Sequence, residues 1–186
     1  MKMSAVKKLC LSAICVALCV VLPLAFHAFG SEAGKAFSPM HLPVLLCGLI
    51  CGPLCGLACG VLGPVLSSLI SGMPPAVALI AMVPELLVYG LFAGLFLKWI
   101  HTGHAAADLY CALVPAMLLG RVAGAAAKAI FTLISAPGTL SFGKLASAYF
   151  VVTLPGAALQ LAVIPALVLL LMRTKLIPAR YPKTKV

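Results

Sequence analysis

Three ionisable residues, Glu85, Arg121 and Lys128, interrupt long apolar stretches of the sequence. A charged side chain in hydrocarbon costs about 2.5–3.5 kcal/mol even on the milder insertion scales, so each group needs a partner or a wet cavity. If the flanking segments are helices that span a membrane, Glu85 and Lys128 lie at a similar depth and Arg121 lies deeper. Two interpretations remain open. Either Glu85 and Lys128 form a structural ion pair, or the three residues line a polar cavity that receives a ligand.

The pair Met40-His41, with His27 nearby in the sequence, raises a metal site as a second kind of chemistry. Cobalt and nickel uptake proteins begin with a similar Met-His pair, whose terminal amine is a further ligand. Here the pair is internal, so that amine is missing. A histidine at the start of a helix is more typical of a cap or a substrate contact. We therefore expect no metal site.

The segment from Gly138 to Lys144 matches the first seven positions of a phosphate-binding loop. The next residue is Leu145, where magnesium binding requires Ser or Thr, and a helix is expected before the segment in place of a strand. We interpret it as an outer loop. No paired nucleophile and base occurs within an apolar run either, so neither an ATPase nor any other catalytic site is expected.

A four-residue repeat of cysteine and glycine runs from Cys47 to Gly60. A ladder of thiol ligands for a metal is one interpretation. A seam of small residues that lets helices approach closely is the other. Pro53 interrupts the ladder and no acidic residue or histidine is interspersed, which favours the seam. The same spacing recurs at Gly90 and Gly94 and at Gly120 and Gly124.

Helices in a bilayer must position these residues, because the composition excludes a soluble domain. Hydrophobic residues make up 64% of the chain, charged residues 9%, and the mean hydropathy is +1.23. Apolar runs of about 20 residues are each long enough to cross a membrane. We expect an all-α integral membrane protein with one domain over 1–186. Its six short transmembrane helices are expected at about 9–27, 40–52, 54–71, 76–100, 107–134 and 149–172.

The net charge of +10 gathers at the two ends of the chain. The basic residues flanking the first and last apolar runs are Lys2, Lys7 and Lys8, and Arg173, Lys175, Arg180, Lys183 and Lys185. This asymmetry predicts a cell-membrane protein with both termini in the cytoplasm. An even number of spans is then required, which divides 42–70 into two helices at Gly52-Pro53. No basic face is interleaved with aromatic residues, so a nucleic-acid partner is not expected.

Four segments make the chain similar to a known family over almost its whole length. They are ALCVVLPLAFH at 17–27, SPMHLPVLLCGLICGP at 38–53, SGMPP at 71–75 and MVPELLVYG at 82–90. These segments resemble the substrate-binding S components of energy-coupling factor (ECF) transporters. The resemblance implies a subunit that binds a vitamin or related micronutrient from outside. It also implies a separate membrane coupling subunit and two cytoplasmic ATPases as partners, and no cofactor.

The resemblance further implies where the cargo lies: near the outer surface, beneath the loops that join helices 1–2, 3–4 and 5–6. The substrate contacts expected on this basis are Met40, His41, Met73, Glu85, Tyr89, Arg121, Lys128 and Gln160. In the family an Ala-xxx-Ala motif on helix 1 docks the coupling subunit. Ala13 and Ala17 match that motif.

The charges in the outer loops and helix interiors bear on the cargo. Basic residues outnumber acidic ones there, namely Lys35, Arg121, Lys128 and Lys144 against Glu32 and Glu85. We therefore expect an anionic cargo or one with a carboxylate; pantothenate fits that sign, and cobalamin remains an alternative. Two other functions stay open. The chain could be a cobalt or nickel uptake component, or a membrane assembly protein without a ligand.

The charge asymmetry gives a topology that can be tested directly. Reporter fusions placed after Pro75 and after Val186 are expected to report opposite sides of the membrane, because six spans place these positions on different faces. Reports from the same side would contradict the six-span topology.

Overall fold

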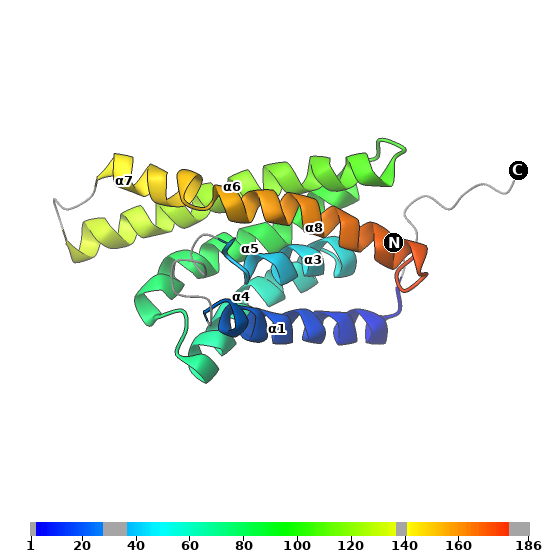
Figure 1. The fold of residues 1–186 in the computed structure, drawn as a ribbon, viewed down its shortest axis with the longest axis horizontal. Coiled ribbons are helices and arrows are strands. Elements are labelled where there is room, and N and C mark those ends of the chain that lie inside the picture. The colour runs from blue at the N-terminus through cyan, green and yellow to red at the C-terminus, as the bar shows by residue number, and fades with distance from the viewer. Residues whose placement is uncertain (1–2, 28–36, 137–140, 179–186) are drawn as a thin grey trace, which may run out of the picture.

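The chain is a bundle of helices, seen in a computed structural model that describes residues 3–27, 37–136 and 141–178 (Figure 1). The described residues contain no strand. The helices are α1 (Ala5–His27), α3 (His41–Cys51), α4 (Pro53–Ser71), α5 (Ala76–Trp99), α6 (Ala105–Ser135), α7 (Phe142–Ala146) and α8 (Leu154–Arg173), with a π-helical turn, η1 (Ser147–Val151), between the last two.

Five segments are long and apolar enough to cross a membrane, and α3 is a shorter apolar helix. The prediction of an all-helical membrane fold with six helices is thereby confirmed. With its 11 residues, α3 is about 16 Å long, roughly half of a bilayer's hydrocarbon thickness. Gly52 separates α3 from α4 with a φ of +103°, and Pro53 occupies the first turn of α4. Only glycine adopts that φ readily, which explains the break in the apolar run.

The last membrane segment begins earlier than the predicted 149, because α7 already starts at Phe142. The expected outer loop therefore ends sooner than the sequence indicates. Pro155 lies in the first turn of α8 and has no N–H to donate back to Val151. The backbone before it widens into η1, in which the Val152 N–H donates to the Ser147 carbonyl at 3.0 Å. The helical path thus continues through η1 in place of a loop.

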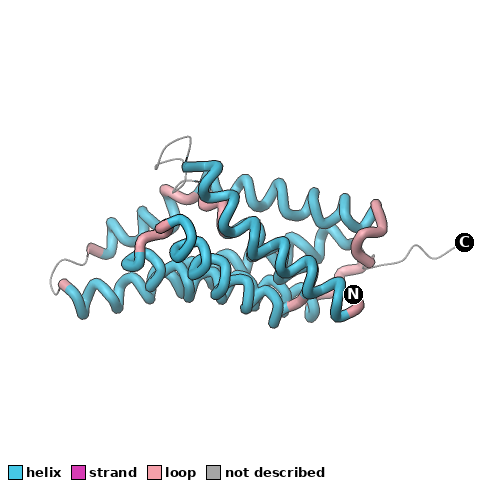
Figure 2. The backbone as a smooth tube through the Cα atoms, turned by 90° about the horizontal axis from the view of Figure 1, so that it is seen from below, coloured by secondary structure: helices cyan, strands magenta, loops and turns pink. Residues whose placement is uncertain are grey.

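The helices run lengthwise, so the bundle has two distinct ends (Figures 1 and 2). At one end, called here the terminal end, α1 begins, α8 ends and α5 connects to α6 (Figure 1). At the other, called the loop end, α4 connects to α5 and α3 begins (Figure 1). Helix α3 contacts α1, α4, α5 and α8. It is buried along nearly its whole length, which accounts for its apolar sequence on all sides.

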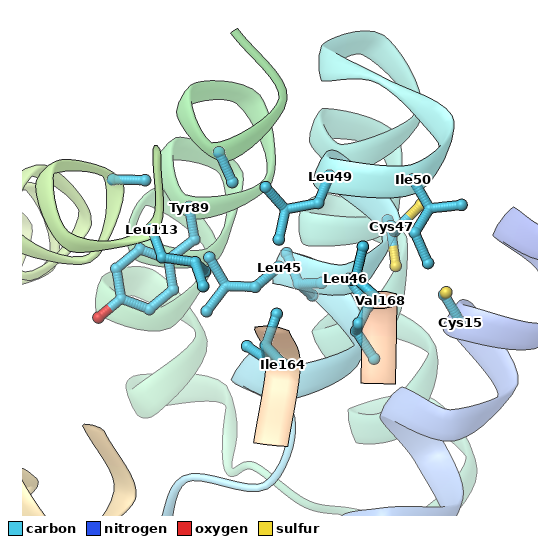
Figure 3. Packing of buried hydrophobic residues seen from close by; sticks show 14 of the residues in the cluster. Cys15, Leu45, Leu46, Cys47, Leu49, Ile50, Tyr89, Leu113, Ile164 and Val168 are labelled. Carbon is cyan, nitrogen blue, oxygen red and sulfur yellow. The ribbon is translucent and has the colours of Figure 1, made fainter. Parts of the chain in front are cut away.

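Three helices meet backbone to backbone at the centre of the bundle. A Cβ atom on Gly90 of α5 would overlap the Gly56 backbone of α4, and one on Gly56 would lie 2.6 Å from the Gly48 Cα of α3. The interpretation of the cysteine–glycine repeat as a packing seam is therefore confirmed. All eight cysteines are free thiols, and Cys15, Leu45, Leu46 and Cys47 belong to the apolar core around this junction (Figure 3).

Gly90→Ala is expected to lower the free energy of unfolding by roughly 1–3 kcal/mol, because its methyl group would overlap main-chain atoms that cannot move aside. Thermal unfolding in detergent measures the effect. Gly143→Ala is the matched control, since no atom lies within 4 Å of its added methyl group. Equal melting temperatures for the two variants would contradict the role of the junction.

Candidate functional site

His41 of α3 and Glu85 of α5 form a buried polar contact. The His41 Nε2 atom lies 3.3 Å from the Glu85 Oε1 atom, and the two side chains are 6% and 8% exposed. The His41 ring also meets the Tyr89 ring edge-on, with centroids 5.1 Å apart. Tyr89 lies one turn from Glu85, so both project from the same face of α5. The imidazole gives the carboxylate the partner that it needs inside a membrane.

Of the two interpretations that the sequence left open, the ion pair of Glu85 with Lys128 is wrong. Lys128 is half-buried, and among the described residues it makes no ion pair with Glu85. The reason is the level of α6 beside α5. A Cβ atom on Gly124 would lie 2.8 Å from the Glu85 Oε2 atom, so Glu85 is level with Gly124. Lys128 is four residues further, about 6 Å closer to the loop end.

Glycines on α6 make room for the polar side chains of α5. A Cβ atom on Gly120 would overlap the Tyr89 ring and lie 3.0 Å from the Glu85 carbonyl oxygen. A Cβ atom on Gly124 would lie against the Glu85 side chain and 3.0 Å from the Tyr149 ring. The spacing of Gly120 and Gly124 was predicted to be a helix contact. Arg121 lies between these two glycines on α6.

Arg121 joins α6 to the start of the last membrane segment. Its Nη1 atom donates to the Tyr149 carbonyl and to the Thr153 hydroxyl, and its Nη2 atom donates to the Thr153 carbonyl at 3.5 Å. The Thr153 hydroxyl donates in turn to the Tyr149 carbonyl at 2.7 Å. Sequence reasoning missed Tyr149 and Thr153. The available signal was Pro155, because the irregular backbone that precedes a proline leaves carbonyls for side chains to use.

Gln160 faces the same region from α8. Ile164, one turn further along α8, lies beside Leu45 of α3, which is one turn after His41 (Figure 3). Both helices run from the loop end to the terminal end (Figure 1). Gln160 and His41 each lie one turn before these two residues, on helices that contact each other. We call His41, Glu85, Tyr89, Arg121 and Gln160 the polar core; all five are buried.

Several atoms of the polar core are buried without a hydrogen-bond partner among the described residues. These atoms are His41 Nδ1, the Tyr89 hydroxyl, and both Nε2 and Oε1 of Gln160. Leaving a buried donor or acceptor unpaired costs about 1–3 kcal/mol, so native structures rarely tolerate several together. The polar core has hydrogen-bonding capacity beyond what its own side chains use.

A cavity of about 150 Å³ adjoins Arg121 between α6 and α8. Its other walls are apolar and include Met117, Phe150 and Leu161. Pockets that enclose a small molecule are usually about 300–1,000 Å³. The space beside Arg121 is thus smaller than a vitamin requires, and α6 and α8 would have to separate to enlarge it.

The remaining predicted contacts lie outside the polar core. Met40 precedes His41 and is buried, and its carbonyl accepts from the Cys19 thiol at 3.8 Å. Met73 lies in the connection from α4 to α5 with 40% of its side chain exposed. Its carbonyl accepts from the Ser67 hydroxyl at 2.7 Å. Of the charged residues expected near the cargo, Lys35 and Glu32 fall outside the described residues, and Lys144 is exposed on α7.

Ala13 and Ala17 lie on the surface of α1 and are exposed. Cys15 and Cys19, on the opposite side of the same helix, are buried against the bundle. Among the described residues, the two alanines therefore do not pack α1 against the rest of the bundle.

Two searches, one of curated proteins and one of solved structures, gave no match to this chain. A scan against family models did match, to the model described as "ECF transporter, substrate-specific component", over residues 7–172. That range covers the whole polar core and all of the bundle except the first residues of α1 and the last residue of α8. The chain belongs to the family of substrate-specific components of ECF transporters.

Proposed function

We propose that this chain captures a vitamin or related micronutrient from outside the cell in its polar core. It passes the cargo inward together with a membrane coupling subunit and two cytoplasmic ATPases. Membership of the family supports a substrate-specific subunit of a transporter in the membrane. The cargo, the partners and the orientation are the parts that we propose.

The observation that carries this proposal is the set of unpartnered atoms on His41, Tyr89 and Gln160. They come from three helices, α3, α5 and α8, and include donors and acceptors. A ligand with hydroxyl and amide groups would satisfy them. A membrane assembly protein without a ligand would leave their cost uncompensated, which makes that alternative the weaker one.

The charges of the polar core favour an anionic cargo. Glu85 already has His41 as its partner, whereas the described partners of Arg121 are neutral carbonyl and hydroxyl groups. A guanidinium has five N–H donors, so Arg121 can still bind a carboxylate. Pantothenate combines a carboxylate with hydroxyl and amide groups, and cobalamin remains an alternative. A cobalt or nickel function has less support, because no group of three or more metal-ligating side chains is assembled in the described residues.

Cargo entry is proposed to separate α6 from α8, which enlarges the cavity beside Arg121. The bonds from Arg121 to Tyr149 and Thr153 hold these segments together. A carboxylate that takes over the guanidinium would replace them. Binding and opening would then be one exchange of hydrogen bonds.

The proposal is tested by mass spectrometry of the small molecule that co-purifies with the protein, followed by calorimetry with that compound. Arg121→Gln is expected to weaken binding about 10- to 100-fold, because it removes a hydrogen bond from a charged group. Gln160→Leu should weaken it about fivefold to tenfold, the value of a neutral hydrogen bond. Lys144→Gln, a change of the same charge on exposed α7, is the control. A cationic cargo, or unchanged affinity in both variants, would contradict the proposed site.

Docking of the coupling subunit is proposed to use Ala13 and Ala17. They line one exposed face of α1 four residues apart, and the lack of bulk there lets another helix come close. Ala13 lies nearer to the terminal end of α1, and Ala17 lies close to the middle of the helix.

Ala13→Trp and Ala17→Trp are each expected to abolish co-purification with the coupling subunit and to leave cargo affinity unchanged, because the indole blocks close approach without reaching the polar core. Ala25→Trp is the matched control, being an exposed alanine of the same helix near the loop end. Affinity measurements and pull-downs on each protein separate the two effects. Lost cargo affinity in either variant would show that this face serves internal packing.

A further inference from the structure

A basic cleft of about 500 Å³ lies at the terminal end of the bundle, away from the polar core. It is enclosed by α1, by the turn between α3 and α4, and by the end of α5. Lys8, Lys98 and His101 contribute its ionisable side chains, and its lining includes no acidic residue. We call these residues and their apolar neighbours the basic cleft.

Neither of the acidic residues that the structure describes lines the basic cleft. Glu85 is paired with His41 in the polar core. Asp108 accepts hydrogen bonds from the Thr102 N–H and the Thr102 hydroxyl, both at 2.7 Å, and does not line the cleft. An anion in the cleft would therefore be surrounded by a lining that holds basic side chains and no carboxylate.

The backbone adds to this field. Helix α4 begins in the cleft at Gly52-Pro53, and no side chain caps its N-terminus. The first N–H groups of a helix attract anions through their unused hydrogen bonds and the helix dipole. The His101 Nδ1–H donates to the Trp99 carbonyl at 3.1 Å, so the Nε2 atom donates to an anion when the imidazole is protonated.

Apolar residues complete the cleft and indicate the kind of anion. Leu49, Leu54 and Leu97 line it beside the basic side chains, and Leu54 is 78% exposed on the outer surface of α4. A small soluble anion has no apolar part to bury against these leucines. A phospholipid has an acyl chain as well as a phosphate, so it could contact both the leucines and the basic side chains. Basic pockets between helices at the membrane surface are suited to anionic headgroups.

We infer that the basic cleft binds the phosphate of an anionic phospholipid such as phosphatidylglycerol, with an acyl chain against Leu54. The inference does not depend on the identity of the cargo. With both termini in the cytoplasm, the terminal end and its cleft face the cytoplasmic leaflet. Only this assignment to a leaflet rests on the proposed orientation. A lipid held there would contact α1, α4 and α5 at once and tie their ends together.

Native mass spectrometry of the full chain in detergent, with phosphatidylglycerol or phosphatidylcholine added, tests the inference. The wild type should retain phosphatidylglycerol preferentially. Each of Lys8→Gln and Lys98→Gln should weaken its retention about fivefold, the usual contribution of one basic residue at a membrane surface. Lys98→Arg should keep it. Arg173→Gln is the matched control, because it removes one exposed charge at the same end of the bundle without touching the cleft.

Three results would overturn the inference. Equal loss in Arg173→Gln would show general surface charge in place of a site. Thermal stabilisation by inorganic phosphate as strong as that by phosphatidylglycerol, at constant ionic strength, would assign the cleft to a soluble anion. Unchanged lipid retention in the lysine variants, with loss of the coupling subunit, would assign it to a protein contact. Melting temperatures of all variants without added lipid show whether each protein remains folded.

Discussion

The direct contact of backbones at Gly48, Gly56 and Gly90 is the constraint on which the rest of this bundle depends. Between helices in lipid the hydrophobic effect offers little, so contact area gained by close approach has to hold them together. Gly120 and Gly124 of α6 lie close to α5 as well, where they make room for the side chains of Tyr89 and Glu85. Because α5 is held at close range by both α4 and α6, the helix can neither rotate nor shift without overlap. The positions of the side chains between the glycines follow from this.

The fixed orientation of α5 determines the position of the Glu85 carboxylate. Glu85 and Tyr89 point toward the start of α3 and toward α6, where His41 pairs with the carboxylate at 3.3 Å. A rotation of α5 by one residue, about 100°, would turn the carboxylate away from the imidazole and toward lipid. The glycine contacts and the contact of His41 with Glu85 therefore support each other. Packing supplies the geometry, and the pair offsets the cost of a charge in hydrocarbon.

The helices could be predicted from the sequence, because apolar runs and basic flanks reflect the bilayer directly. The partner of Glu85 could not. To pair Glu85 with Lys128, the relative depth of the two residues in the membrane has to be known to within one helical turn. The sequence does not define how far neighbouring helices are shifted along their axes, because that shift depends on their contacts. The role of Thr153 was missed for a different reason. Its acceptors exist because η1 replaces a regular helix before Pro155, and hydropathy does not report the local geometry of the backbone. The seam of glycines was recognised, since spacing alone identifies it.

Helix α3 connects the two polar regions of the molecule. Its first residue, His41, belongs to the polar core, and its last, Cys51, lines the basic cleft with Gly52. With only 11 residues, α3 is short enough to place both within one rigid element. Gly48 leaves no space for α3 to slide past Gly56 and Gly90. Any displacement of His41 by cargo must therefore move α3 together with α4 and α5 or be absorbed by side chains of the polar core. The looser boundary is the one between α6 and α8, where the cavity beside Arg121 already lies. Opening at that boundary would separate Gly124 from the Tyr149 ring but would leave the glycine contacts among α3, α4 and α5 intact, which fits the proposed route of cargo entry.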